Sequence, residues 1–381
     1  MPALKPLALA VLATLTLHAH AENNTADLTQ EGENNTSTIE QSGTANSFTQ
    51  TQAGQHNSGF VTQSGTENSS TVYQEGAGSY SQLIQEGGNL NIGQIYQSGN
   101  DNFAYVTQSD YEHRGLGIHG FADQNTALVE QSGSGNRGGI NQTLSSYNDA
   151  SVRQNGDNNN STNEQYSADY GTQTTVQEGN NNTGDIYQAS GDYLTASIYQ
   201  SGDNNTAQIA QLADNATATV NQEGNGNTAD IRQGSVFGGS SATGAIARVD
   251  QTGDLNTTNV RQEGSFNVLS VSQTGTSNMV SGNGETIYEP GQQGDSNVLS
   301  AQQDGTGNEL YFTQTGNDNE LYVMQSGDAN TIAATQTGVG YSAILSQNGS
   351  ANSMNITQTS QGNMATVTQS GTGNMATLTQ R

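Results

Sequence analysis

The sequence predicts an all-β protein, a β-solenoid of stacked coils with two strands and about 22 or 23 residues in each coil. Three observations support this fold class. One motif recurs about every eleven residues, small or apolar residues alternate with polar ones inside each copy, and the spacing between copies alternates between eleven and twelve over long stretches. Because one copy cannot bury its own apolar face, we expect the copies to stack, as in amyloid-like cross-β structures.

The motif is clearest in the last copy, which spans residues 369–380. It reads Gln-x-Gly-x-x-Asn-x-small-x-aliphatic-x-Gln, and the final Gln begins the next copy. Successive side chains of a strand point to opposite faces. We therefore expect Asn374, Ala376, Leu378 and Gln380 on one face and the residues between them on the other. The Gly and small polar residues before this run favour a chain reversal.

About thirty copies follow one another, each ending in an anchor glutamine. From Gln131 to Gln211 the anchors are alternately eleven and twelve residues apart, which indicates two different turns and hence two strands per coil. The anchor and the Asn six residues before it are the predicted ladder residues for self-assembly. Those singled out are Asn24, Gln30, Asn35, Gln41, Asn46, Gln52, Asn57, Gln63, Asn352, Gln358, Asn363, Gln369, Asn374 and Gln380. The turn glycines singled out are Gly32, Gly43, Gly54, Gly65, Gly349 and Gly371.

Two further positions of each copy are expected to fill the interior. The position two before the anchor is usually Ile, Val or Leu, and the position four before it is usually Ala, Ser or Gly. Between residues 297 and 332 the second position becomes larger, which predicts a change in how the interior is filled. The residues there are Leu299, Leu310, Leu321 and Ile332.

The composition excludes several classes of function. The 381 residues carry a formal net charge of -27, which argues against nucleic acid and anionic membranes as partners. No cysteine is present, so disulfides and thiolate metal sites are excluded. Only 30% of the residues are hydrophobic. That composition alone is typical of disorder, but the fixed repeat indicates an ordered structure.

Residues 1–21 are expected to be a secretory signal peptide, with Lys5, an apolar run over residues 7–17 and a cleavage motif at residues 19–21. Residues 22–381 are expected to form a single solenoid domain without membrane insertion, because no later segment has the roughly 20 apolar residues that a spanning helix needs. The repeat is interrupted near residues 109–124, 234–247 and 279–291. These insertions are interpreted as loops on the flank of the solenoid, with partner binding or regulation as the alternative.

The motif with Gly, Asn, Ala, an aliphatic residue and Gln at these spacings resembles the curlin repeat of curli fibre subunits, from Asn24 to Gln380. The resemblance implies an extracellular functional amyloid that is exported through the periplasm and an outer-membrane pore. It also implies nucleation by a minor subunit and a role in biofilm matrix, adhesion and surface attachment. This chain has more copies and fewer basic residues than the short enterobacterial subunits, so a major, rather than a nucleating, subunit is favoured.

The residue types themselves favour a fibre. Amides of Asn and Gln that are stacked in register can each donate to one neighbour and accept from the other. The motif is intact from Asn24 to Gln30 and again from Asn374 to Gln380, so no capping copy is expected at either end. A solenoid without caps presents sheet edges that can pair with another chain. The sequence therefore predicts a homopolymer that associates end to end.

Acidic residues gather in the predicted turns, either directly after the anchor or after the turn glycine. The second group includes Asp157, Asp203, Asp254, Asp318 and Asp328. If these carboxylates stack on neighbouring coils, they would repel one another at neutral pH, so acid or salt is expected to speed assembly. Simple solubility is the alternative. Calcium could also be bound by such turns, but the glycine-rich signature of calcium-binding repeats is missing, and no metal is expected.

No cofactor and no catalytic residue are expected, and the protein is predicted not to be an enzyme. The histidines His56, His113 and His119 have no nucleophile or metal-ligand companion in the sequence. Two other functions remain open. One is a minor nucleating subunit of the same fibre, and the other is a monomeric solenoid whose flat face binds ice or polysaccharide.

Overall fold

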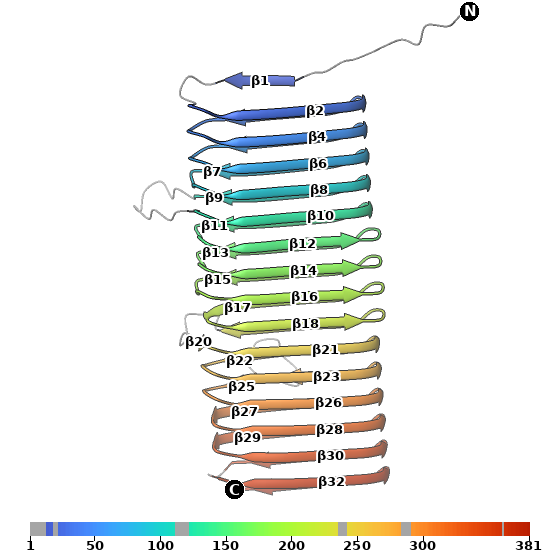
Figure 1. Ribbon diagram of the computed structural model, residues 1–381. Helices are drawn as coiled ribbons and strands as arrows, with labels where there is room; N and C mark the ends of the chain where they lie inside the picture. The colour runs from blue at the N-terminus through green and yellow to red at the C-terminus, as the bar shows by residue number, and fades with distance from the viewer. Residues whose placement is uncertain (1–12, 18–21, 111–121, 235–241, 283–290, 360–361) are drawn as a thin grey trace, which may run out of the picture. The chain divides into compact units, whose positions relative to one another are not determined.

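The computed structural model describes residues 13–17, 22–110, 122–234, 242–282, 291–359 and 362–381. These residues form strands and turns, so none of them belongs to a helix that could cross a membrane. The chain divides into two compact units, Met1–Glu164 and Gln165–Arg381. Each unit is a β-solenoid of parallel strands, as the sequence predicts (Figure 1). The expectation of one domain over residues 22–381 stays a prediction.

In the first unit the strands alternate between two parallel sheets. One sheet pairs β2, β4, β6, β8, β10 and β12 in that order, and the other pairs β1, β3, β5, β7, β9 and β11. The strand bounds are β1 Ala13–Leu17, β2 Thr25–Glu33, β3 Thr36–Gln41, β4 Ser47–Gln55, β5 Ser58–Gln63, β6 Ser69–Ala77, β7 Tyr80–Glu86, β8 Ile92–Asn100, β9 Phe103–Ser109, β10 Thr126–Ser134, β11 Arg137–Thr143, β12 Asp149–Asn155 and β13 Asn160–Tyr166.

The second unit repeats this arrangement. One sheet pairs β14, β16, β18, β21, β23, β26, β28, β30 and β32 in that order, and the other runs from β15 to β33. The strand bounds are β14 Thr172–Glu178, β15 Thr183–Ala189, β16 Thr195–Ser201, β17 Thr206–Asp214, β18 Thr217–Glu223, β19 Thr228–Gly234, β20 Ala242–Thr243, β21 Ile246–Asp254, β22 Thr257–Glu263, β23 Val268–Thr276, β24 Met279–Gly282, β25 Gln292–Gln293, β26 Val298–Thr306, β27 Glu309–Asn317, β28 Glu320–Asp328, β29 Thr331–Val339, β30 Ser342–Ser350, β31 Ser353–Gln358, β32 Met364–Thr372 and β33 Met375–Gln380.

The register places like positions of the motif beside one another on neighbouring strands. Gln30 pairs with Gln52, and Gln74 pairs with Gln97, at separations of 22 and 23 residues. These separations confirm the predicted coil of two strands. A one-residue slip would turn every apolar side chain outward, so the alternating pattern fixes the register.

The three predicted insertions leave this register intact. Residues 111–121, 235–241 and 283–290, the central parts of the insertions, lie outside the described residues. On either side of the first insertion, Gln97 still pairs with Gln131. Around the last insertion, β24 and β25 share one strand position between β22 and β27. The extra residues therefore do not shift the stacking of the coils that follow.

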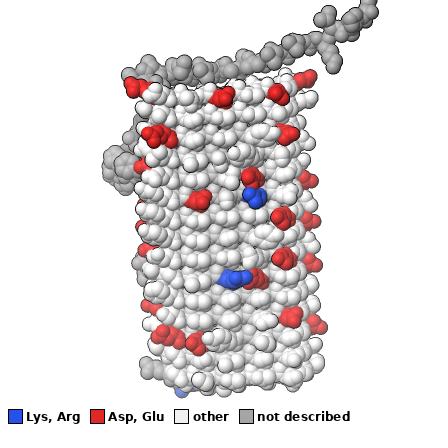
Figure 2. Space-filling model, in the orientation of Figure 1, with Lys and Arg blue, Asp and Glu red and all other residues white. Residues whose placement is uncertain are grey.

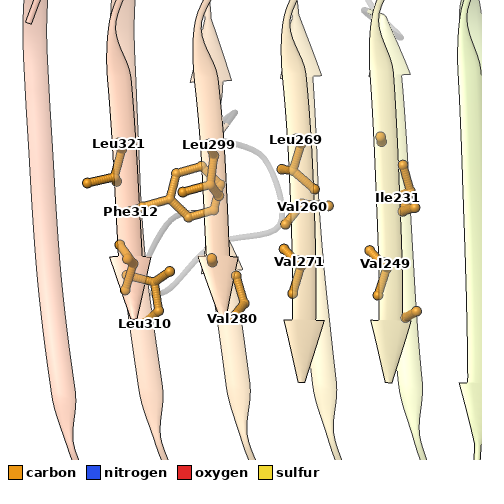
Figure 3. Packing of buried hydrophobic residues seen from close by; sticks show 14 of the residues in the cluster. Ile231, Val249, Val260, Leu269, Val271, Val280, Leu299, Leu310, Phe312 and Leu321 are labelled. Carbon is orange, nitrogen blue, oxygen red and sulfur yellow. The ribbon is translucent and has the colours of Figure 1, made fainter. Parts of the chain in front are cut away.

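Aliphatic side chains from both sheets fill the space between them, as Figure 3 shows for the second unit. The first unit has a separate cluster that extends from Ile39 to Val152. Each fully buried Leu or Ile contributes about 1.5–3 kcal/mol through removal of its surface from water. The enlarged interior positions are all fully buried, which confirms the predicted change in filling. They are Leu299, Leu310, Leu321 and Ile332.

One interior position of the first unit departs from the pattern. Gln50 stands two residues before an anchor, where an aliphatic residue is expected, and its side chain is buried. Ser37 donates a hydrogen bond of 2.6 Å to Oε1 of Gln50. Gly59 lies opposite, where a Cβ atom would overlap the Gln50 amide. A glycine therefore provides the room for a long polar side chain in this coil.

The first strand lies within the predicted signal peptide. Ala13–Leu17 forms β1 and pairs in register with β3, with Leu17 beside Gln41. This pairing covers one edge of β3 as long as residues 13–17 remain attached. The signal-peptide assignment itself stays a prediction.

Candidate functional site

The anchor glutamines form one continuous ladder in each sheet of each unit. Parallel pairing in register places each anchor directly beside the anchor of the next coil, with its side chain on the buried face. In the first unit Gln30 donates from Nε2 to Oε1 of Gln52 over 2.6 Å, and Gln52 donates to Gln74 over 2.8 Å. In the second unit the same contact joins Gln336, Gln358 and Gln380 at 2.9 and 2.8 Å.

The second N–H of an interior anchor amide donates to a backbone carbonyl oxygen of the opposite sheet. Gln52 also donates to the backbone oxygen of Thr36 at 2.9 Å, and Gln336 donates to that of Glu320 at 2.9 Å. Both donors of a buried amide are thereby used, which avoids the cost of about 1–3 kcal/mol for an unpaired buried donor. The ladder consequently stabilises both the stacking of coils and the closure of each coil.

All anchor-to-anchor hydrogen bonds of the described ladders have the same direction. The amide of one anchor donates to the next anchor in the sequence, from Gln30 to Gln154 in the first unit and from Gln177 to Gln369 in the second. Among the described residues, no glutamine donates to Oε1 of Gln30 or Gln41. The two ends of a ladder are therefore chemically different, with an acceptor at one end and a donor at the other.

The motif asparagines make a second set of ladders at the turns. Oδ1 of Asn24 accepts from the backbone N–H of Asn46 at 2.9 Å, and Oδ1 of Asn46 accepts from that of Asn68 at 3.0 Å. The Nδ2 group of Asn46 donates to the carbonyl oxygens of Ser42 and Gly65. Each Asn thus closes its own turn and holds the turns of two neighbouring coils.

The predicted ladder residues all occupy the expected strand and turn positions. Asn35, Asn46, Gln52, Asn57, Gln63, Asn352, Gln358 and Gln369 are buried, whereas Asn24, Gln30, Gln41, Asn363 and Gln380 are half-buried and Asn374 is exposed. The less buried members lie in β2, β3, β32 and β33 and in the turns that lead into these strands. The role of these residues in the association of one chain with another stays a prediction.

The predicted turn glycines have a steric reason to be glycine. Gly32, Gly43, Gly54, Gly65 and Gly349 have φ between +82° and +124°, where other residues are strained. A Cβ atom on any of them would also overlap the carbonyl oxygen of a glycine in the next coil. Gly371 has the same conformation, with φ of +109°, but meets only the Asn374 amide. At these five positions close stacking of the turns therefore requires glycine.

A third ladder was not predicted from the sequence. Asp203 accepts at Oδ1 from the backbone N–H of Asn180 at 2.8 Å, and Asp254 accepts from that of Asn225 at 2.9 Å. Asn225 in turn accepts from the N–H of Asp203. These acids alternate with Asn and cap turns, so they do not face another acid in the next coil. The regular recurrence of Asp or Asn three residues after the anchor is the signal that could have revealed this role.

Other turn acids do stack on one another. The backbone N–H of Asp169 donates to Oδ1 of Asp192 at 3.1 Å, and that of Asp192 donates to Oδ1 of Asp214 at 3.1 Å. The three carboxylates therefore follow one another on consecutive coils. The expected repulsion between stacked acids applies to this column, whereas the column of Asp203 and Asp254 is spaced by asparagines.

The asparagine ladders are interrupted in the second unit. Leu194 and Ala216 occupy two successive Asn positions and join a small apolar cluster with Ala168 and Ala213. Tyr341 replaces another Asn, and its buried hydroxyl donates to the backbone oxygen of Thr337 at 3.0 Å. The glutamine ladders continue past these positions, so the anchors define the stack more strictly than the asparagines do.

The charged side chains of the strands lie outside the glutamine and asparagine ladders. On the face shown in Figure 2, acidic side chains are spread over the surface and outnumber the basic ones. Arg153 pairs with Glu130, Arg232 with Asp230, and Arg248 with Asp250, all within 3.0 Å. Burial raises the pKa of the Asp110 carboxyl; the N–H of Ala122 partly offsets this effect, and the nearby Asp123 charge adds to it.

The histidines and the acidic residues are the candidate metal ligands within the described part of the chain. No three His, Asp or Glu side chains there are grouped so that they could hold a metal ion. His56 lies in the exposed turn before Asn57, within 3.5 Å of the Asn34 amide. His113 and His119 lie outside the described residues.

Comparison with known proteins identifies the repeat. A family model described as the curlin associated repeat matches residues 21–54, 54–87, 202–234 and 294–327. Two of these matches lie in the first unit and two in the second. No curated protein matches the chain significantly.

Proposed function

Because this chain is a curlin-repeat protein, with matched repeats in both of its units, we propose that it is a subunit of an extracellular, amyloid-like fibre. The observation that carries the proposal is the one-way glutamine ladder. Each coil offers an acceptor to the coil before it and a donor to the coil after it, so the contact between coils of one chain can also join two chains.

The outer edges of the described sheets supply the surfaces for this contact. β32 and β33 each pair with one described strand, β30 and β31, and their outward-facing Met364 and Met375 are exposed. β2 likewise pairs with one described strand, β4. In the proposed fibre, β32 and β33 of one copy pair with β2 and β3 of the next. Gln369 and Gln380 then donate to Gln30 and Gln41 of the neighbouring copy.

Such a contact is head to tail and does not close on itself, so it produces a filament rather than a small oligomer. β1 occupies the edge of β3 that this contact needs. Removal of residues 1–21, the predicted signal peptide, would free that edge. Secretion therefore fits the order of events, with export and processing first and assembly afterwards.

The setting in which the fibre acts follows from the family resemblance. We place the protein outside the cell, in a biofilm matrix that serves adhesion and surface attachment. Export through an outer-membrane pore and nucleation by a minor subunit complete the proposal. The unbroken glutamine ladders favour the major subunit, because a long stack of like coils suits the body of a fibre.

Seeded growth tests this function. Residues 22–381 would be released from denaturant at neutral pH and followed by an amyloid-binding dye, with and without preformed fibres. We expect a lag that seeds remove, and diffraction near 4.7 and 10 Å from the product. Catalytic amounts that accelerate a different subunit would instead indicate a nucleator. A β-rich monomer that stays in solution under these conditions contradicts the proposal.

A further inference from the structure

A groove lies on the outer face of the first unit, and the anchors Gln97, Gln131 and Gln154 are among its lining residues. It crosses β6, β8, β10 and β12 and has a volume of about 480 Å³. This volume is within the range of small-molecule sites in proteins. Its long side chains are Tyr73, Tyr96, Glu130 and Arg153, and the shorter ones beside them are Ser98, Ser132 and Asn155.

Two tyrosines form the aromatic part of the groove. Tyr73 and Tyr96 are register partners on neighbouring strands, so their rings share one outward column. The Tyr73 hydroxyl donates to Oε2 of Glu75 at 3.0 Å, which restrains the ring. This hydrogen bond, together with the Glu75 charge, raises the pKa of Tyr73 and keeps its hydroxyl protonated. One strand spacing, about 5 Å, separates the two tyrosines along this column.

Polar groups continue the same column. Glu130 is the register partner of Tyr96, and Arg153 is the register partner of Glu130. Nε of Arg153 donates to Oε2 of Glu130 at 2.6 Å, so the two side chains hold each other in place. Ser98, Ser132 and Asn155 add hydroxyl and amide groups along the neighbouring column. A ligand in the groove thus meets flat rings at one end and paired donors and acceptors at the other.

We propose that this groove binds a neutral polysaccharide, with successive sugar rings lying along the column from Tyr73 to Arg153. The apolar face of a hexose ring packs on a tyrosine ring, and its hydroxyl groups exchange hydrogen bonds with Glu130, Arg153 and the serines. The direction of the groove across the strands suits an extended chain of linked sugars. The contact leaves the sheet edges free and does not depend on assembly.

The charges of the site favour an uncharged ligand. Glu75 and Glu130 place two carboxylates at the groove against the single guanidinium of Arg153, and the chain has a formal net charge of -27. Anionic polymers are therefore repelled, both locally and over distance. An apolar peptide would leave the Glu130 and Arg153 groups without the hydrogen bonds that sugar hydroxyls supply.

Calorimetric titration of the full chain tests the proposal with two probes of similar length. Cellohexaose is the neutral probe, and an oligomer of galacturonate is the anionic one. We expect binding of cellohexaose and little or none of the uronate. The double variant Tyr73→Ala with Tyr96→Ala is expected to weaken cellohexaose binding by about tenfold or more, because two stacking contacts are lost.

Matched variants separate loss of the groove from loss of the fold. Tyr73→Phe with Tyr96→Phe keeps both rings and should retain most of the affinity. Tyr187→Ala with Tyr322→Ala removes two partly exposed tyrosines elsewhere and should leave binding unchanged. The proposal is overturned if cellohexaose does not bind, if the uronate binds more tightly, or if the alanine variants at Tyr73 and Tyr96 bind like the parent chain.

Discussion

Gln347 donates from its side-chain Nε2 to Oε1 of Gln369 over 2.9 Å, and Gln369 donates to the backbone oxygen of Ser353 but to no further glutamine among the described residues. The Oε1 atom of Gln369 therefore already accepts a ladder hydrogen bond, whereas its Nε2 group has one hydrogen left to donate to another glutamine. The same holds for Gln380, which accepts from Gln358. The stability of the stack and, in the proposed fibre, its growth depend on the same kind of hydrogen bond.

Interior anchors are expected to contribute strongly to stability. Gln222 accepts from Gln200 at 2.9 Å and donates to Gln251 at 2.8 Å. Gln222→Leu would leave buried groups of both neighbours unpaired and should lower the free energy of unfolding by about 1–3 kcal/mol, as measured with urea. Gln208→Leu, on the exposed face of β17, is the control and should change it by less than about 0.5 kcal/mol. Equal effects of the two substitutions would contradict a special role of the ladder.

Two glycines of one turn separate steric overlap from backbone strain. Gly305 and Gly307 both have positive φ, but only at Gly305 would a Cβ atom overlap the next coil, at the carbonyl oxygen of Gly327. Gly307→Ala should cost about 1 kcal/mol for the left-handed conformation. Gly305→Ala should cost above about 3 kcal/mol, because the coils must also move apart. Denaturant unfolding of the two variants would show this order, and similar losses would refute the overlap.

Asp110 should give a small pH-dependent contribution to stability. Burial raises the pKa of its carboxyl in the folded chain, with the Asp123 charge acting in the same direction. A raised folded pKa means that the contribution is fully present below the ordinary pKa of Asp and is lost as the pH rises through the folded value. Relative to Asp110→Asn, the free energy of unfolding of the parent chain should therefore fall as the pH rises from the ordinary pKa of Asp through the raised folded value. A difference that is constant with pH, or that grows as the pH rises, would contradict this assignment.

Salt should speed assembly at neutral pH. Copies that each carry a formal net charge of -27 repel one another, and salt screens this repulsion over about 10 Å at 0.1 M. Seeded growth followed by dye binding is expected to accelerate with added sodium chloride at neutral pH. Near the isoelectric point, pI ≈ 4.1, the acceleration should disappear. A growth rate at neutral pH that does not change with salt would argue against charge repulsion as the barrier.

Much of the fold could be predicted because the same pattern of buried and exposed positions recurs in about thirty copies. The buried positions of Leu299 and Leu310 and the pairing of Gln30 with Gln52 follow from the alternation and from the spacing of the anchors. The direction of the glutamine ladder could not be predicted. An amide side chain carries both a donor and an acceptor, and the sequence does not say which of them faces the next coil. The capping role of Asp203 was also missed, since it depends on which backbone N–H faces the carboxylate.

Single departures from the repeat also could not be predicted from the sequence. Gln50 is tolerated in the interior because Gly59, on the opposite sheet, lacks a side chain, and this relation appears only when the two strands are opposed. Tyr341 can replace an Asn because its hydroxyl reaches the Thr337 carbonyl. The groove at Tyr73 and Tyr96 likewise results from register between copies 23 residues apart. Pairings across coils, rather than the motif itself, decide these details.

The most direct test of end-to-end assembly is disulfide trapping of the predicted register between copies. Continuation of the β30–β32 register would place Thr368 of one copy beside Thr29 of the next, on the outer face. The chain has no cysteine of its own. Fibres of the variant carrying Thr29→Cys and Thr368→Cys should therefore oxidise to a ladder of disulfide-linked multimers, because neighbouring strands lie within bridging distance. The control carrying Thr29→Cys and Thr366→Cys is offset by two residues and should not. Fibres that cross-link equally in both variants, or in neither, would contradict the proposed junction.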